Sequence, residues 1–295
     1  MRGFRSVLFF CALALAGVVH AQDGGDGPSD EVKKFLSEMH FESGTIAVPE
    51  AGATLNLVPE YRYLGAKDAQ RVLQELWGNP PDDSVLGLIL PDGEKTLRDE
   101  TSWAVVVTYS DDGHVTDAEA AKTDYTKLLK DMQEAAHDAN AERKKQGYHA
   151  VELVGWATAP HYDQANNKLY WAKELAFEGT GEHTLNYDIR ALGRGGYLSL
   201  NAIAGISQLP RVEAGMQRVL GMTQFDAGHR YADFNSGTDK VAAYGIAALV
   251  AGGIAAKAGL FAKLFGLLLA AKKVLWLGLV AVAAGVRKLF KGRAD

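Results

Sequence analysis

The side chains best suited to binding chemistry in this sequence are aromatic rings, an amide and guanidinium groups on three neighbouring predicted strands. Such a combination suits contact with a protein, a peptide or an anionic glycan, because aromatic rings attract cations and guanidinium groups bind anions. In an antiparallel sheet these residues could share one face. The alternative left open is a core tryptophan with one buried arginine paired to an acid. The candidate binding residues are Trp156, Tyr162, Trp171, Asn186, Arg190 and Arg194.

Motifs for catalysis and metal binding are weaker. The histidines form neither a His-x-x-x-His nor a His-Glu-x-x-His pair, and the single cysteine, Cys11, lies in an N-terminal apolar stretch. His161 and Asp163 alone are too few ligands for a metal site. We therefore expect no metal and no cofactor. The catalytic residues are unknown, and a non-enzymatic role is favoured because no nucleophile motif such as Gly-x-Ser-x-Gly is present.

The run Gly193-Arg194-Gly195-Gly196 has the glycines of a phosphate-binding loop but connects two predicted strands. A dinucleotide or P-loop motif instead opens a helix, whose N-terminal N–H groups bind the phosphate. We therefore expect an ordinary turn in which the glycines adopt positive φ.

Helices and strands alternate through the middle of the chain, which then continues in four strands with short connections. Short connections favour antiparallel neighbours, so the sequence predicts one α+β domain with a mainly antiparallel sheet and several helices. A capping-box pattern, Thr116-x-x-Glu119, is expected to begin the longest helix. The predicted helices cover residues 30–39, 66–77, 116–145 and 207–220, and the predicted strands 45–48, 54–58, 84–90, 103–109, 149–158, 168–177, 184–191 and 197–204.

Charge is distributed unevenly along the 295 residues. The net charge of −5 divides into +2 for residues 1–21, −14 for residues 22–240 and +7 for residues 241–295. An acidic body argues against nucleic-acid binding, which needs a basic surface. Residues 1–21 combine a basic start, a short apolar stretch and small residues before Gln22, the pattern of a secretory signal peptide.

The C-terminal end carries a longer apolar run. Residues 241–260 contain one charge, Lys257, and at about 1.5 Å per helical residue they can cross the roughly 30 Å hydrocarbon core as a transmembrane helix. Residues 261–295 form a basic, apolar tail that we place in the cytoplasm, with a second span as the alternative. Small residues at four-residue spacing, such as Ala243 and Ala247, suggest self-association or a membrane-protein partner besides membrane lipid.

These features predict five parts. They are a signal peptide (1–21), a flexible linker (22–30), an exported α+β domain (31–238), a transmembrane helix (241–260) and the tail (261–295).

Several sequence blocks, in order along residues 40–255, resemble the bacterial family of predicted membrane-anchored proteins called domain-of-unknown-function family 2167. The resemblance implies an envelope protein with an exported domain and a C-terminal anchor. It implies no activity, cofactor or catalytic residue. The blocks are WGNPP (77–81), SWAVVVTY (102–109), NAER (140–143), GWATAPHYD (155–163), KLYWAKEL (168–175), LNYDIRALGRGG (185–196), RYADF (230–234) and DKVAAYG (239–245).

The expected function is that of a membrane-anchored bacterial envelope protein of unknown molecular activity. We expect it in the cell membrane, with the domain facing the periplasm or the outside as a binding or scaffolding module. The alternative is an envelope hydrolase or carbohydrate-active enzyme that uses carboxylates. A transport or stress-related accessory role is a third hypothesis.

Overall fold

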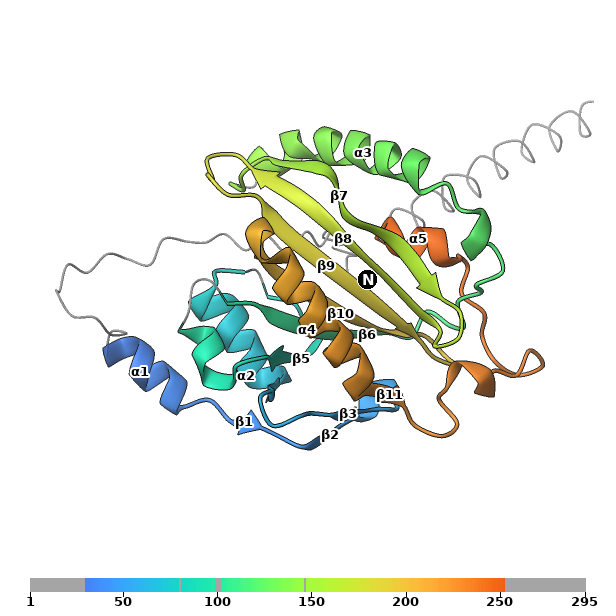
Figure 1. Cartoon of the computed structure of the whole chain (residues 1–295), viewed down its shortest axis with the longest axis horizontal. Coiled ribbons are helices and arrows are strands. Elements are labelled where there is room, and N and C mark those ends of the chain that lie inside the picture. Colours follow the sequence, from blue (N-terminus) through green and yellow to red (C-terminus); the bar gives the residue numbers. More distant parts are fainter. Residues whose placement is uncertain (1–29, 80, 99–101, 146, 253–295) are drawn as a thin grey trace, which may run out of the picture. The chain divides into compact units, whose positions relative to one another are not determined.

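The computed structural model describes residues 30–79, 81–98, 102–145 and 147–252. The expected signal peptide, nearly all of the expected linker and residues 253–295 lie outside the described residues. Two sheets and five α-helices form the described part (Figure 1).

The larger sheet is antiparallel throughout and has the strand order β1-β4-β5-β6-β10-β9-β8-β7. The strands are β1 (Phe41–Glu42), β4 (Arg62–Gly65), β5 (Val85–Leu90), β6 (Ala104–Ser110), β7 (Val151–Asp163), β8 (Lys168–Phe177), β9 (Thr184–Leu192) and β10 (Tyr197–Gly205). The smaller sheet has the order β11-β3-β2, with β2 (Thr45–Val48), β3 (Ala53–Asn56) and β11 (Thr223–Phe225). The predicted α+β fold and the antiparallel run β7 to β10 are confirmed.

The helices are α1 (Asp30–Ser37), α2 (Ala66–Arg71), α3 (Tyr125–Lys145), α4 (Leu209–Met222) and α5 (Ile246–Val250). A π-helical turn at Val72–Leu76 extends α2, as the predicted helix 66–77 requires. Short 3-10 turns lie at Pro49–Ala51, Gly93–Leu97, Ala120–Lys122, Ile206–Gln208 and Tyr231–Asp233.

Alternation along the strands divides the larger sheet into two faces. On β9, Leu185, Tyr187 and Ile189 are fully buried in one apolar cluster with Val212 and Met216 of α4. The smaller sheet belongs to the same cluster. In Figure 1, α4 (orange) crosses in front of β9 and β10 on this face. We call it the α4 face.

The opposite face is covered by three separate apolar clusters. One packs α1 and α2 on β4, β5 and β6. Another packs α5 on Leu169, Trp171 and Leu192, and a third packs α3 on the far ends of β7 and β8. None of the three clusters covers the middle of β8, β9 and β10 on this face. Side chains along a strand alternate between the two faces, so every second residue of these strands points into this uncovered area.

The longest helix does not begin at the predicted capping box. Residues 120–122 form a 3-10 turn, and α3 starts at Tyr125. The side chain of Asp124 accepts hydrogen bonds from the N–H groups of Thr126 and Lys127, each 3.0 Å long. Asp124 is therefore the N-cap, and the predicted start at Thr116 is wrong.

The residues expected to begin the transmembrane helix do not start a helix at Val241. Val241 forms an isolated parallel bridge with His114, and α5 begins only at Ile246. Ile246, Leu249 and Val250 are buried against the larger sheet. Among the residues that the structure describes, no helix is both long enough and apolar enough to cross a membrane.

Candidate functional site

A row of polar side chains lies in the middle of the face opposite α4, between the three apolar clusters. On β9 this face carries Asn186, Asp188 and Arg190, which alternate with the apolar residues of the α4 face. Polar residues at the centre of a sheet are unusual, because burying them without partners costs free energy. We call the whole set the polar track. Its members are Thr108, Lys173, Asn186, Asp188, Arg190, Ser199 and Asn201.

Strand register brings these residues from four strands into neighbouring positions. Lys173 of β8 lies opposite Asn186, and Asp188 lies opposite Asn201 of β10. Arg190 lies opposite Ser199, which in turn lies opposite Thr108 of β6. Directly opposed residues on one face have their Cβ atoms about 5 Å apart.

Asp188 is the most deeply buried member of the polar track, with 3% of its surface exposed. Its carboxylate accepts a hydrogen bond from Asn201 Nδ2 at 2.9 Å and one from Arg190 Nη1 at 3.0 Å. Lys173 Nζ lies 3.3 Å from the other carboxylate oxygen. Burial alone would raise the pKa of Asp188, but the two cations and the amide outweigh it, so its pKa lies below the ordinary value.

The charges of this array do not cancel. Lys173 and Arg190 are both positive and keep only 15% and 14% of their side-chain surface exposed. Asp188 is the single carboxylate that they share. One positive charge therefore remains in a half-buried position, where it favours a nearby negative group.

Arg190 is held in place by rings on both sides. Its guanidinium carbon lies 5.1 Å from the centre of the Trp171 ring and 5.9 Å from that of Tyr197. Its Nη1 also donates to the carbonyl of Ile189 at 3.2 Å. These contacts limit the movement of the guanidinium before any ligand is present.

The structure places five of the six predicted binding residues on the face that carries the polar track, and only Arg194 among them lies elsewhere. Trp171, Asn186 and Arg190 share the face with the polar track, although Trp171 is 1% exposed and is a core residue. Its indole N–H is buried and makes no hydrogen bond with any residue that the structure describes.

Trp156 and Tyr162 lie on β7 and hold the segment before α3. The indole of Trp156 donates to the carbonyl of Tyr125 at 3.2 Å, and the Tyr162 hydroxyl donates to Asp117 at 3.0 Å. Both rings are partly buried in the cluster that contains α5.

Arg194 lies apart from Arg190, in the turn after β9. It donates to both carboxylate oxygens of Asp239, at 2.7 and 2.9 Å, and lowers the pKa of that carboxyl. This bidentate ion pair connects the turn with the segment that leads to Val241.

Sequence reasoning missed most of the polar track, namely Thr108, Lys173, Asp188, Ser199 and Asn201. A usable signal was present on β9, where Asn186, Asp188 and Arg190 alternate with apolar residues in a strand that has neighbours on both sides. In an antiparallel sheet such alternation usually marks a solvated face, but Asn186 and Asp188 are buried, which distinguishes this face from an ordinary surface.

The glycines of Gly193-Arg194-Gly195-Gly196 do not adopt positive φ, so that prediction is wrong. Two of them are needed because other groups approach closely. A Cβ on Gly193 would lie 2.7 Å from the ring of Phe225, and a Cβ on Gly196 would overlap the carbonyl oxygen of Ser110. Close approach of backbone is the other structural use of glycine.

His114 lies beside this turn in an aromatic sandwich. Its ring stacks on Tyr231 at 4.2 Å and on Phe234 at 3.9 Å between ring centres. It is 8% exposed, and its Nδ1 makes no hydrogen bond with any described residue. Burial lowers the pKa of His114, although the backbone of Arg194 and Gly193 and, to a smaller extent, the charges of Asp117 and Asp239 act in the opposite direction.

We expect the free energy of unfolding to fall as the pH drops from about 7.5 to about 5.5. The unfolded chain protonates His114 near its ordinary pKa, whereas the folded protein resists protonation until a lower pH, so acid favours unfolding. Denaturant titrations at both pH values will measure the difference. His114→Phe keeps the ring stack without a titratable group and should reduce the difference, whereas the exposed His137→Phe should not. Equal pH dependence in wild type and His114→Phe would contradict this assignment.

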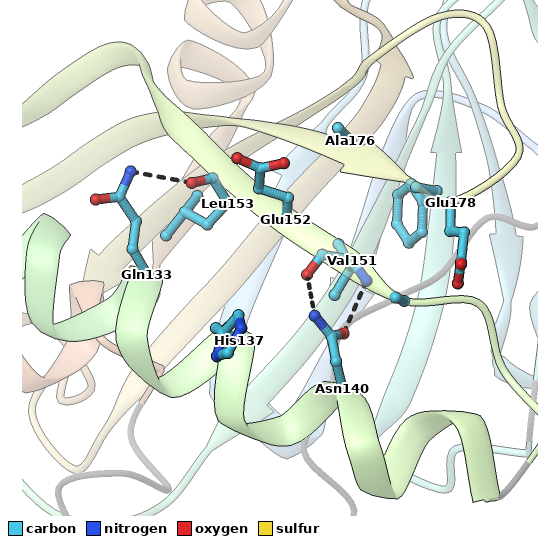
Figure 2. Close-up of a pocket in the computed structure, with 10 residues that line it drawn as sticks. Gln133, His137, Asn140, Val151, Glu152, Leu153, Ala176 and Glu178 are labelled. Carbon is cyan, nitrogen blue, oxygen red and sulfur yellow. Dashed lines mark hydrogen bonds between the residues drawn. The ribbon is translucent and has the colours of Figure 1, made fainter.

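A second candidate site is a groove of about 490 Å³ between α3 and the edge strand β7 (Figure 2). Asn140 completes the strand edge, since its side chain donates to the carbonyl of Val151 and accepts from the N–H of Val151, at 3.0 and 2.8 Å. Gln133 donates to the carbonyl of Leu153 at 3.0 Å. These bonds dock the helix on the strand and so have a structural purpose.

The groove also contains the carboxylates of Glu152 and Glu178, the groups that a hydrolase would need. Lys144 donates to Glu178 at 3.0 Å and lowers its pKa, whereas a general acid requires a raised pKa. The groove therefore does not favour the hydrolase alternative. Within the described ranges, no group of three or more His, Cys, Asp or Glu side chains is arranged to hold a metal ion.

Comparison with known proteins places the chain in a family. It matches the family described as "Protein of unknown function (DUF2167)" over residues 40–283, and it belongs to that family. None of the curated proteins matches it.

Three solved structures are similar at low levels. The cyanobacterial PsbP protein (CyanoP) of Synechocystis sp. PCC 6803 is 11% identical with a TM-score of 0.35, over 62% of this chain and 91% of its own. The Saccharomyces cerevisiae Ran-binding protein Mog1p is 10% identical with a TM-score of 0.33, over 67% and 100%. LpqN, involved in cell envelope biogenesis of Mycobacterium tuberculosis, is 12% identical with a TM-score of 0.31, over 68% and 98%. Similarity this low does not extend to function.

Proposed function

We propose that this member of the DUF2167 family is a membrane-anchored protein of the bacterial envelope, whose exported domain binds a ligand on the polar track. The observation that carries the binding proposal is the array of buried Asp188 with the mostly buried cations of Lys173 and Arg190. A core of apolar residues would be at least as stable as such an array. Ligand recognition gives a reason for polar groups at a position where packing alone does not require them.

The anchoring proposal rests on the two ends of the sequence. Residues 1–21 have the pattern of a cleaved signal peptide, and the C-terminal 55 residues are apolar with a net charge of +7. Because Ile246, Leu249 and Val250 contact the sheet, we assign the membrane contact to the residues after Val250. The partners proposed for this part are lipid and either a second copy or another membrane protein.

Reporter fusions test the anchoring. Alkaline phosphatase, which is active only outside the cytoplasm, should be active when fused after residue 240 and inactive when fused after residue 295. Inactivity after residue 240 would overturn export of the domain. Activity after residue 295 would replace the single pass by two spans.

Native mass spectrometry of the detergent-solubilised full chain tests the binding. Wild-type protein from native membranes should carry a non-covalent ligand mass that Ser199→Trp lacks, because the larger ring would fill the polar track. Ser199 is half-buried and makes no hydrogen bond with the described residues, so the exchange removes no internal bond. Thr116→Trp, at an exposed position, is the control. Identical masses in wild type and Ser199→Trp would contradict a ligand at this place.

A further inference from the structure

We infer that the ligand of the polar track presents a small oxyanion, a carboxylate or phosphate group, to the row formed by Arg190, Ser199 and Thr108. This inference rests on the proposed function, since it names the chemical class of the ligand at the same site. Charge, donor geometry and the absence of internal partners for two hydroxyl groups each support it.

The row joins three strands side by side. Arg190 of β9 lies opposite Ser199 of β10, and Ser199 lies opposite Thr108 of β6. Cross-strand neighbours on one face lie about 5 Å apart at Cβ, so one small ligand can reach two of these side chains together. Leu169 and Val85, the partners of Arg190 and Thr108 on the next strands, are apolar and buried and limit the row at both ends.

The donors in this row are only partly used by the protein. Arg190 Nη1 donates to Asp188 and to the carbonyl of Ile189, whereas Nε and Nη2 make no hydrogen bond within the described part of the chain. The hydroxyl groups of Ser199 and Thr108 likewise have no partner among the described residues, and both side chains are half-buried. A guanidinium edge beside two hydroxyl donors matches the acceptor oxygens of a carboxylate or a phosphate.

The charge of the site selects an anion over a neutral or cationic ligand. Lys173 and Arg190 share one carboxylate, Asp188, so the array has one surplus positive charge. An oxyanion with one negative charge would balance it. A neutral sugar would leave that charge unbalanced, and a cation would be repelled by it. The contacts with Trp171 and Tyr197 limit the movement of the guanidinium beforehand, which lowers the entropy lost on binding.

Isothermal titration of the full chain in neutral detergent tests the inference, with sodium phosphate, sodium acetate and glycerol as the probes at constant chloride. At least one anion should bind saturably, and glycerol should not. Ser199→Ala and Thr108→Val should each weaken anion binding about tenfold, the usual effect of losing one hydrogen bond to a charged group. Thr158→Val changes a hydroxyl on the α4 face, whose contact is with Glu213, and should bind as wild type does.

The probes also separate the two forms of oxyanion. Preference for acetate assigns a carboxylate ligand, and preference for phosphate assigns a phosphate group. If neither anion binds saturably, or if Ser199→Ala and Thr108→Val bind as wild type does, the inference is wrong. The proposed function would still stand in that case if Ser199→Trp loses a ligand mass, and it would fall as well if no such loss is found.

Discussion

Asp188→Ala will lower the free energy of unfolding by about 3–5 kcal/mol, the range measured when one partner of a buried ion pair is removed. The substitution leaves Lys173 and Arg190 half-buried without the carboxylate that they share. It also removes the acceptor for the amide of Asn201. Urea unfolding of the full chain in detergent, followed by tryptophan fluorescence, will measure the loss.

Two further variants separate charge from shape in this array. Asp188→Asn keeps the size of the side chain and an oxygen that can accept from Asn201, so it should lose less than Asp188→Ala. Glu178→Ala removes an ion pair with Lys144 in which both side chains are more than half exposed, and it should cost less than about 1 kcal/mol. A loss below about 1 kcal/mol for Asp188→Ala would mean that water replaces the carboxylate at little cost.

Gly196→Ala will also destabilise the protein, by about 3 kcal/mol or more, because the new Cβ would overlap the carbonyl oxygen of Ser110. That carbonyl belongs to β6, the neighbour of β10 in the sheet, so the overlap cannot be relieved by rotating a side chain. The expected result is a lower denaturation midpoint with the native far-ultraviolet circular dichroism spectrum retained at low denaturant.

The adjacent glycine supplies the control. A Cβ on Gly195 would meet only the hydroxyl of Tyr109, at 3.8 Å, which is an ordinary contact. Gly195→Ala should therefore be neutral or stabilising by up to about 1 kcal/mol, because alanine reduces the freedom of the unfolded chain. Equal losses for both substitutions would show that the turn requires glycine for its backbone conformation and not for close approach.

The strands of the larger sheet were predictable where apolar and polar residues alternate within the strand and short turns connect it to the next one. Residues 168–177, 184–191 and 197–204 were assigned with ends within one residue of β8, β9 and β10. The strand β4, Arg62–Gly65, was missed because four residues give too little alternation. It is held in place by pairing with β5, more than twenty residues later, and single-sequence patterns do not show such pairing.

The start of α3 illustrates a choice that tertiary contacts make. Both Thr116 and Asp124 are suitable N-cap residues. Tyr162 of β7 binds Asp117, and Trp156 of the same strand binds the carbonyl of Tyr125. These contacts from a strand far along the chain hold residues 117–125 in a shape that allows the helix to begin only after Asp124.

The residue types of the candidate site were predictable from the sequence, but the ion pairs between its side chains were not. Trp171, Asn186 and Arg190 were identified because aromatic and arginine side chains on neighbouring strands can share a face. The acid that pairs with Arg190 could have been any of many in an acidic domain. Asp188 is its partner because it lies two residues away on the same face of β9, where Lys173 also reaches it across the strand pair.

The bridge between His114 and Val241 has a mechanical consequence. The backbone of His114 donates to the carbonyl of Lys240 at 2.8 Å, and its carbonyl accepts from Ala242 at 2.9 Å. A pulling force applied to the chain after Val250 would reach α5 first, then the two hydrogen bonds of this bridge and the Arg194–Asp239 ion pair, and after these the strand β11. We therefore expect these C-terminal contacts to break before the eight-stranded sheet bears the load.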